Sequence, residues 1–203
     1  MIVYGSSLSP FVRKVLVVIA EKGLTATHKP VFPQDGSPEF RACSPLGKIP
    51  GFQDGDFKIA DSTAIVHYLE RKYPVPALFP AGAEDFARAV WWDEFADTSL
   101  VASAGKVFFN LVVKKLMGAG DPDMAAVDAA LTKELPPLFT YLESQIHGPY
   151  LIGDGFSIAD ISVASPFVNL KVAGHPLDAA KWPKLDAYVQ PILARPSFVN
   201  AKD

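Results

Sequence analysis

Residues 44–68 read SPLGKIPGFQDGDFKIADSTAIVHY, and this stretch decides the class of fold. Its centre, Asp54-Gly55, is a dipeptide favoured in tight hairpin turns, so residues 49–53 and 57–60 are expected to pair as antiparallel strands. Apolar residues at helical spacing follow over residues 62–72. Two paired strands followed directly by a helix indicate a sheet with helices packed on it.

The residues before this stretch add further alternating elements. Residues 2–4 are a short buried-strand candidate, and residues 10–22 carry helical spacing that ends at Gly23, where a C-terminal cap belongs. Another extended segment is expected at about residues 28–32. The order strand, helix, strand, two strands, helix in fewer than 80 residues predicts a mixed α/β sheet of the thioredoxin-like kind.

The chain changes character near residues 73–83, YPVPALFPAGA, where prolines and a glycine indicate a linker. The segments after it are helical: residues 84–118 as one long helix or two joined near 99–105, 124–146 with a kink at Pro136-Pro137, about 158–172, and about 184–194. Ser157 and Asp160 have the spacing of a capping box at the start of the third of these. We therefore predict an α/β domain over residues 1–77 and an all-helical domain over residues 84–203.

Composition excludes several classes of protein. The 203 residues are 49% apolar and 20% charged, and the net charge is −3 without a basic block, so nucleic acid is not an expected partner. No apolar run approaches the roughly 20 residues of a membrane span and no charged leader precedes one, so a soluble cytoplasmic protein is expected. The single cysteine, Cys43, and four scattered histidines predict neither a disulfide nor a metal site.

Ser9 allows two interpretations. Ser9-Pro10-Phe11 opens the first predicted helix, and serine followed by proline is a favoured helix start, so Ser9 can be a plain N-cap. The same position supports chemistry, because a helix N-terminus presents unpaired amides and a positive dipole end. A serine hydroxyl there could donate a hydrogen bond to a bound thiolate and so favour the ionised, nucleophilic form.

The opening stretch offers a second pair of candidates. If the Ile49-Pro50 bond is cis, the backbone groups of Ile49 turn outward and can pair with an extended peptide; an ordinary trans proline at a strand edge is the alternative. Asp61-Ser62 can cap the helix over 62–72, or can bind an amino acid head group through its hydroxyl, amides and carboxylate. Lys48 alone has the character of a solvated side chain.

Four segments together make the chain resemble the cytosolic glutathione transferases of the serine type: SPFVRKVLVVIAEKG, SPLGKIP, IADSTAIVHYLERKYP and GDGFSIAD. The resemblance covers nearly the whole length. It implies an N-terminal thioredoxin-like domain that binds glutathione as co-substrate, without a metal. It also implies an all-helical C-terminal domain that helps to shape a pocket for a small hydrophobic electrophile, and a homodimer.

The resemblance assigns a role to each candidate residue. Ser9 matches the serine that activates the glutathione thiol. The glutathione contacts implied are Phe11, Lys48, Ile49, Pro50 as the cis proline, Asp61 and Ser62. Phe108 and Leu111, with Phe11, are the candidates to line the electrophile pocket, or they belong to the core. Ser157 and Asp160 match a capping box needed for folding.

Departures from the family pattern refine the expected chemistry. Asp61 stands where glutamate is common, so its carboxylate reaches less far, and Gly51 stands where a larger strand residue is usual. Cys43 lies outside the first helix start, so disulfide exchange and related thiol transfer are less favoured than conjugation. Two functions remain: an enzyme that adds glutathione to hydrophobic electrophiles in detoxification, or a glutathione-binding module of the same fold with little turnover.

Overall fold

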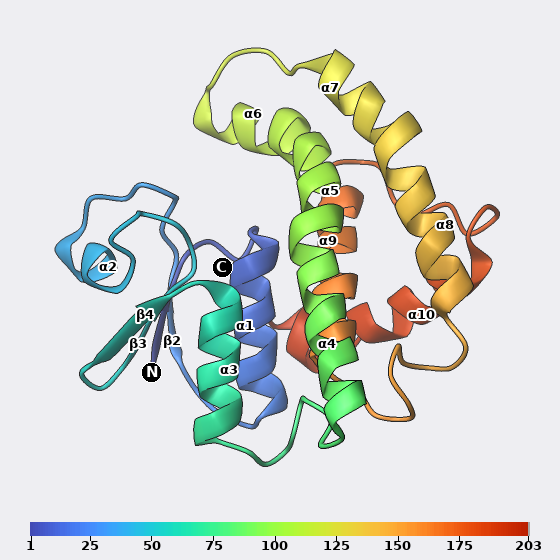
Figure 1. Cartoon of the computed structure of the whole chain (residues 1–203). Coiled ribbons are helices and arrows are strands. Elements are labelled where there is room, and N and C mark those ends of the chain that lie inside the picture. Colours follow the sequence, from blue (N-terminus) through green and yellow to red (C-terminus); the bar gives the residue numbers. More distant parts are fainter. Residues whose placement is uncertain (203) are drawn as a thin grey trace. The chain divides into compact units, whose positions relative to one another are not determined.

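The computed structural model describes residues 1–202, and these divide into two compact units. The first unit takes in residues 1–80 together with residues from Arg195 onward, and the second takes in residues 81–194 (Figure 1). The predicted C-terminal domain of residues 84–203 therefore differs from the second unit at its end. Residues 195–202 pack with the first unit instead, for a reason given below.

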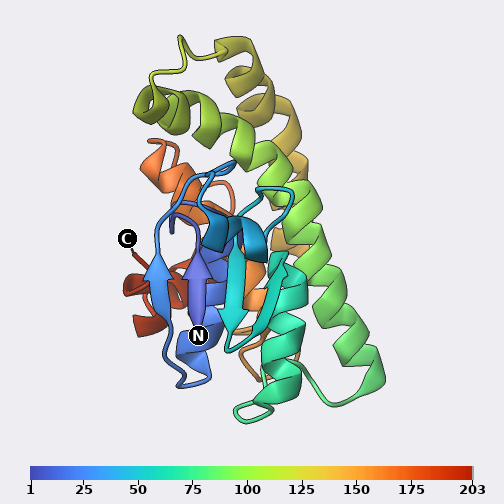
Figure 2. The same cartoon turned by 90° about the vertical axis from the view of Figure 1, so that its left-hand side faces the viewer.

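The first unit is a mixed four-stranded sheet with helices on both faces. Its elements are β1 (Ile2–Tyr4), α1 (Pro10–Glu21), β2 (Thr27–Lys29), α2 (Pro38–Cys43), β3 (Gly51–Asp54), β4 (Phe57–Ala60), α3 (Ser62–Lys72) and α11 (Pro196–Val199). The strand order is β2-β1-β3-β4, with β1 and β2 parallel and the other pairs antiparallel. Helices α1 and α3 lie side by side on one face, and α2 lies on the other (Figures 1 and 2). The predicted thioredoxin-like arrangement is confirmed.

The hairpin and the second strand differ in detail from the prediction. In the β3–β4 hairpin Asp54 pairs with Phe57, so the two-residue loop is Gly55-Asp56, and Gly55 takes the positive φ of 60° that such a loop needs. The second strand is limited to Thr27–Lys29, because its partner β1 has only three residues. Helix α2 was not predicted, since six residues are too few to display helical periodicity.

A buried ion pair fixes the segment that follows α3. Lys22 Nζ lies 2.6 Å from the Glu70 carboxylate and also donates to the carbonyls of Tyr73 (2.8 Å) and Pro76 (2.9 Å). The Glu70 carboxylate in turn accepts the backbone N–H of Leu78 at 3.2 Å. The predicted linker has no regular secondary structure, but its first half is held against the first unit by these charged groups.

The C-terminal residues are held to α1 by one carboxylate. Glu21 accepts two hydrogen bonds of 2.8 Å from the Arg195 guanidinium and one of 2.5 Å from the Ser197 hydroxyl. Burial raises the pKa of Glu21, but the hydrogen bonds and charge of these two residues outweigh burial and leave the pKa below its ordinary value. This bidentate pair explains why residues 195–202 return to the first unit.

The pKa of Glu21 predicts an acid-sensitive contact. A carboxyl whose pKa is lowered by folding stabilises the fold above its unfolded pKa, and this stabilisation is lost as the pH falls through the folded pKa. We expect Glu21→Gln to cost about 1 kcal/mol of unfolding free energy near pH 7, because the pair is partly exposed. In urea unfolding the difference from the parent should shrink as the pH is lowered from about 7 through the folded-state pKa of Glu21, which lies below the ordinary value. The exposed, weakly paired Glu84→Gln is the control; a cost that stayed constant as the pH was lowered would contradict the assignment.

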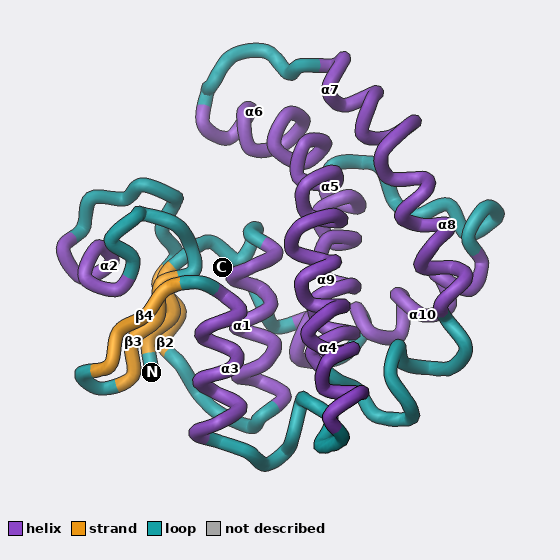
Figure 3. The backbone as a smooth tube through the Cα atoms, in the orientation of Figure 1, coloured by secondary structure: helices purple, strands orange, loops and turns teal. Residues whose placement is uncertain are grey.

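All the regular secondary structure of the second unit, residues 81–194, is helical, and loops connect the helices (Figure 3). A continuous helical run begins with α4 (Ala83–Phe95), α5 (Val101–Phe108) and α6 (Lys114–Met117), joined by π-helical turns at Ala96–Leu100 and Phe109–Val113. The remaining helices are α7 (Met124–Ala129), α8 (Leu135–Gln145), α9 (Ile158–Val172) and α10 (Pro183–Leu193), with a π-helical turn at Ala130–Glu134 between α7 and α8. Of the two alternatives for residues 84–118, one long helix is correct.

The helix irregularity predicted at Pro136-Pro137 is a π-helical turn that lies just before these prolines, at Ala130–Glu134. These prolines fall in the first turn of α8, where missing N–H groups cost least, and the wide turn at Ala130–Glu134 directly precedes them. Helix α9 is the centre of the unit: twelve of its fifteen residues are buried, and it packs against α4, α5 and α10. A helix covered on all sides in this way is apolar all round rather than on one stripe.

Candidate functional site

Ser9 is the N-cap of α1, as one of the two interpretations predicts. Its backbone is extended, Pro10 follows at the first helical position, and its Oγ accepts from the Val12 N–H at 3.5 Å. That bond is long, so the cap is weak. Within residues 1–202 the Ser9 hydroxyl has no acceptor for its own proton. Ser9 therefore presents a donor at the positive end of a twelve-residue helix.

The loop that leads to Ser9 is tightly held at Gly5. Gly5 has φ +137°, and its carbonyl lies 2.6 Å from His28 Nε2. A Cβ at this position would lie 2.6 Å from Val12 Cγ2 and 2.9 Å from Ile49 Cβ, so only glycine fits. Two residues later, the buried Arg13 donates to the Ser7 carbonyl at 3.0 Å. These contacts place the loop before Ser9 directly against Ile49.

Adding a methyl group at Gly5 should disrupt this approach. We expect Gly5→Ala to lower the unfolding free energy by about 3 kcal/mol, through overpacking against Val12 and Ile49 and through an unfavourable φ. Urea unfolding measures the loss. Gly105→Ala is the matched control, because a Cβ there meets no neighbouring atom and alanine is the better helix former. Equal stability of the two variants would show that the close approach is not a constraint.

The Ile49-Pro50 peptide bond is cis, as the resemblance implies. In the described part of the chain, no hydrogen bond reaches the backbone N–H or C=O of Ile49, which precedes the first residue of β3. The Ser44 hydroxyl donates to the Lys48 carbonyl at 2.6 Å, while the Lys48 side chain extends into solvent. Ile49 thus offers free backbone groups at a strand end, where an extended peptide can pair.

The environment of Gly51 and Cys43 accounts for one departure from the family pattern. A Cβ on Gly51 would lie 3.2 Å from Cys43 Cβ and 3.2 Å from the Phe40 ring, so α2 leaves little room for a larger residue. Cys43 is buried, and burial raises the pKa of its thiol, against a smaller opposing effect of Lys58. A buried, protonated thiol is not a nucleophile, which agrees with its exclusion from the chemistry.

Asp61 and Ser62 begin α3. Asp61 is the N-cap, with φ +80°, and its carboxylate accepts the Ala64 N–H at 3.1 Å. A non-glycine residue at positive φ is uncommon and clusters at functional sites. Ser62 is buried, and the next residue, Thr63, receives a hydrogen bond of 3.3 Å from the buried Lys14 ammonium. Sequence reasoning missed this lysine, because its only signal is a charge within an apolar helix.

The sheet register brings these loops to one edge. Tyr4, Gly51 and Ala60 pair in a single row across β1, β3 and β4. The row is the last residue of β1, the first of β3 and the last of β4, so the loop to Ser9, the cis proline and the cap of α3 all leave the sheet at the same edge. The register therefore brings the three loops that carry Ser9, Pro50 and Asp61 to this edge of the sheet. The edge presents hydroxyls, free backbone groups and helix N-termini.

The predicted pocket residues of the second unit, Phe108 and Leu111, lie close together in one helical run. Phe108 ends α5 and is buried, and Leu111 lies in the π-helical turn at Phe109–Val113 and is half-buried. Phe11, in the first turn of α1, is also half-buried. Their contact with a ligand stays a prediction.

No cluster of three or more histidine, cysteine or acidic side chains in residues 1–202 has an arrangement that could hold a metal ion. No helix in the same range combines the length and apolarity needed to cross a bilayer.

Comparison with known proteins identifies the family. Residues 3–77 match the glutathione S-transferase N-terminal domain and residues 123–190 the glutathione S-transferase C-terminal domain. Glutathione S-transferase 3 of Zea mays is 34% identical over 201 residues, covering 96% of this chain and 90% of the relative. The chain belongs to the glutathione S-transferase family.

Solved structures agree with this assignment. A glutathione S-transferase from Rhodospirillum rubrum F11 superposes with a TM-score of 0.91 at 26% identity, over 98% of this chain and 90% of the other. Glutathione S-transferase-I bound with lactoylglutathione gives a TM-score of 0.87 at 25% identity, over 98% and 97% of the two chains.

Proposed function

We propose that this glutathione transferase activates the thiol of glutathione at Ser9 and adds it to small hydrophobic electrophiles. The observation that carries the proposal is the single edge of the sheet where a serine hydroxyl donor, free backbone groups and a second helix N-terminus meet. A free thiol, with a pKa of about 8.5, is mostly protonated at neutral pH. A hydrogen bond from Ser9 and the α1 dipole would stabilise the thiolate and raise its concentration.

The rest of the peptide would be bound along the same edge. The free N–H and C=O of Ile49 would pair with the cysteinyl backbone, next to Pro50, and Lys48 would reach the glycyl end. The amides at the start of α3 and the Ser62 hydroxyl would receive the γ-glutamyl carboxylate. Asp61 uses one carboxylate oxygen to cap the helix, so the other would meet the ammonium group. Phe11 would pack against the ligand.

Conjugation then needs little further chemistry. The thiolate sulfur attacks the electrophilic carbon and forms a C–S bond; in an aryl halide the C–halogen bond breaks and the halide leaves, and the thiol proton has already passed to solvent. Holding both reactants together removes much of the entropic barrier. Phe108 and Leu111 are the residues of the second unit that we propose to contact the electrophile.

The direct test measures the thiolate itself. Absorbance of bound glutathione, titrated from about pH 5 to about pH 9, should place the pKa of its thiol below the free value of about 8.5. The parent protein should also conjugate 1-chloro-2,4-dinitrobenzene. A lowered pKa without detectable turnover would favour the alternative, a glutathione-binding module. An unshifted pKa would contradict thiol activation at this site.

Family membership supports three further proposals. We propose that residues 1–77 bind glutathione while residues 84–203 shape the electrophile pocket, that the protein acts in the cytoplasm in detoxification, and that it forms a homodimer. Sedimentation of the purified chain at micromolar concentration measures the last of these, and a monomer there would contradict it.

A further inference from the structure

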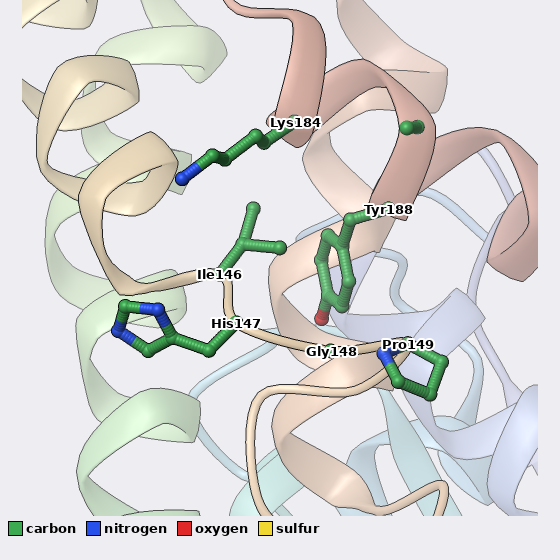
Figure 4. A pocket seen from close by; sticks show the side chains of 7 residues that line it. Ile146, His147, Gly148, Pro149, Lys184 and Tyr188 are labelled. Carbon is green, nitrogen blue, oxygen red and sulfur yellow. The ribbon is translucent and has the colours of Figure 1, made fainter.

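The hollow of about 420 Å³ between the end of α8 and one face of α10 offers a ligand little to bind (Figure 4). Its apolar side chains Ile146 and Tyr188 are only 7% and 3% exposed, so almost none of their surface can be covered. The Tyr188 hydroxyl already donates to Asp160 at 2.8 Å. Groups that can refine the recognition of glutathione lie in the first unit instead, in the loop before Lys48.

Two residues hold the turn that comes just before the proposed glutathione contacts. Arg41 lies in α2, and Gln34 lies in the loop between β2 and α2. Three successive carbonyls of the turn accept hydrogen bonds from these two residues: Pro45 from Arg41 Nη1 (3.4 Å), Leu46 from the Gln34 side-chain amide (3.1 Å) and Gly47 from the Gln34 backbone N–H (2.8 Å). We call Arg41 and Gln34 the turn clamp.

The Arg41 guanidinium joins two segments of the chain. Its Nε donates to the Asp35 carbonyl at 2.7 Å, and its Nη2 donates to the main-chain and side-chain oxygens of Gln34, each at 3.1 Å. The bond from Nη1 to Pro45 reaches the second segment. All three nitrogens of the planar fork are therefore used, which a lysine ammonium at this position could not reproduce.

The backbone at the turn clamp has an uncommon conformation. Gln34 has φ +68°, and Gly47 has φ +69°. A Cβ at Gly47 would lie 2.6 Å from Arg41 Nη1 and 2.7 Å from the Gln34 side-chain oxygen, so the clamp closes directly over this glycine. A non-glycine residue at positive φ costs free energy and is found most often at functional sites. Gln34 therefore adopts a conformation that local stability alone does not favour.

The turn connects directly to Lys48. The Gly47 N–H donates to the Ser44 carbonyl at 2.9 Å and closes the turn, and the Ser44 hydroxyl donates to the Lys48 carbonyl at 2.6 Å. Ile49 is held separately, because its side chain lies against the loop at Gly5. The turn clamp therefore bears on the position of Lys48 more than on that of Ile49.

We propose that Arg41 and Gln34 are positioning residues that make the site selective for the glycine residue of glutathione. This proposal rests on the proposed function, in which Lys48 reaches the glycyl end. The turn clamp holds the backbone before Lys48 in one conformation, so less conformational freedom is lost when the ligand binds. Neither residue is required to contact glutathione.

The test compares glutathione with γ-glutamylcysteine, which lacks the glycine residue, by calorimetry on the full chain. The parent should bind glutathione about tenfold more tightly. Arg41→Lys keeps the charge but cannot bridge both segments, so glutathione should bind about fivefold more weakly, while γ-glutamylcysteine affinity stays within about twofold. KM for glutathione should rise by a similar factor, and kcat at saturating glutathione should hold, because Ser9 is unchanged.

Gln34→Gly separates positioning from stability. Glycine suits φ +68°, so this variant should melt close to the parent. It removes the side chain that bonds to Arg41 and Leu46, so glutathione should again bind about fivefold more weakly and γ-glutamylcysteine as in the parent. Arg71→Lys is the matched control, because Arg71 is an exposed arginine in the last turn of α3; both affinities should stay unchanged.

The outcomes distinguish the turn clamp from the proposed function. Equal weakening of both ligands, or unchanged glutathione affinity in Arg41→Lys and Gln34→Gly, would overturn the clamp and leave the proposed function intact. A parent that bound neither ligand would contradict the proposed function itself, and the role of the clamp with it.

Discussion

Replacing Ser9 with alanine is expected to lower kcat/KM for 1-chloro-2,4-dinitrobenzene about 100-fold and to leave glutathione affinity within about threefold. In the proposed mechanism the hydroxyl contacts the thiolate rather than the peptide, so its loss should affect the reacting atom more than binding. A factor of about 100 corresponds to about 2.7 kcal/mol, and the same loss should raise the pKa of the bound thiol by about two. Thiolate absorbance and steady-state rates measure the two effects separately.

Two further variants separate chemistry from helix capping. The Ser9 cap is long, at 3.5 Å, so Ser9→Ala should cost no more than about 1 kcal/mol of stability. Ser9→Thr keeps a hydroxyl and should recover much of the rate. Ser37 is the matched control, because it also precedes a proline at a helix start, that of α2, yet lies outside the proposed site; Ser37→Ala should conjugate at the parent rate. A full rate in Ser9→Ala would remove Ser9 from the mechanism.

The order of elements in the first unit could be predicted because its signals are local. A helix start at Ser9-Pro10 and a turn near Asp54-Gly55 are set by neighbouring residues, and both occur where expected. The π-helical turns, such as Ala96–Leu100, could not be predicted, because a five-residue widening leaves the apolar spacing almost unchanged.

The parts of the fold that escaped prediction depend on partners distant in sequence. The buried Lys22 ammonium pairs with Glu70 and donates to two distant carbonyls. The C-terminal residues are tied to α1 by the hydrogen bonds of Arg195 and Ser197 to Glu21. Each residue, taken alone, has the character of a solvated surface charge.

The candidate site also has features that depend on neighbouring residues and features that depend on partners distant in sequence. The N-cap positions of Ser9 and Asp61 could be found from helix-start rules, and the roles proposed for them come from the resemblance. The positive φ of Asp61 could not be predicted, because nothing in its residue type demands it. The row formed by Tyr4, Gly51 and Ala60 could not be predicted either, because it depends on the register of the strands.

The largest stability effect is expected from Asp160, which is fully buried at the start of α9. Its carboxylate accepts the N–H groups of Leu151 and Ser157, each at 2.9 Å, and the hydroxyls of Ser157 (3.2 Å) and Tyr188 (2.8 Å). Asp160→Ala would leave several buried donors without an acceptor and open a small cavity. We expect a loss of about 4 kcal/mol, enough to unfold much of the protein at ordinary temperature.

Asp160→Asn tests whether shape or acceptor chemistry matters. The amide has nearly the same volume, but its NH₂ group would face donors, so we expect a loss of at least about 2 kcal/mol in urea unfolding. Asp123→Ala is the matched control, since Asp123 is an exposed N-cap with one bond of 3.0 Å to Ala126, and it should cost about 1 kcal/mol. If Asp160→Ala cost no more than Asp123→Ala, the buried network would not be the anchor of α9.

The pH dependence distinguishes Asp160 from Glu21. Burial raises the pKa of Asp160, and the hydrogen bonds from Leu151, Ser157 and Tyr188 only partly oppose it. A carboxyl with a raised pKa binds its proton more readily in the folded state, so stability from this group increases as the pH falls through that pKa. The cost of Asp160→Ala should therefore persist or grow in mild acid, while the cost of Glu21→Gln should fall only at the lower pH at which Glu21 takes up its proton in the folded state. A cost that vanished in mild acid would mean that Asp160 stabilises the fold chiefly as an ionised group.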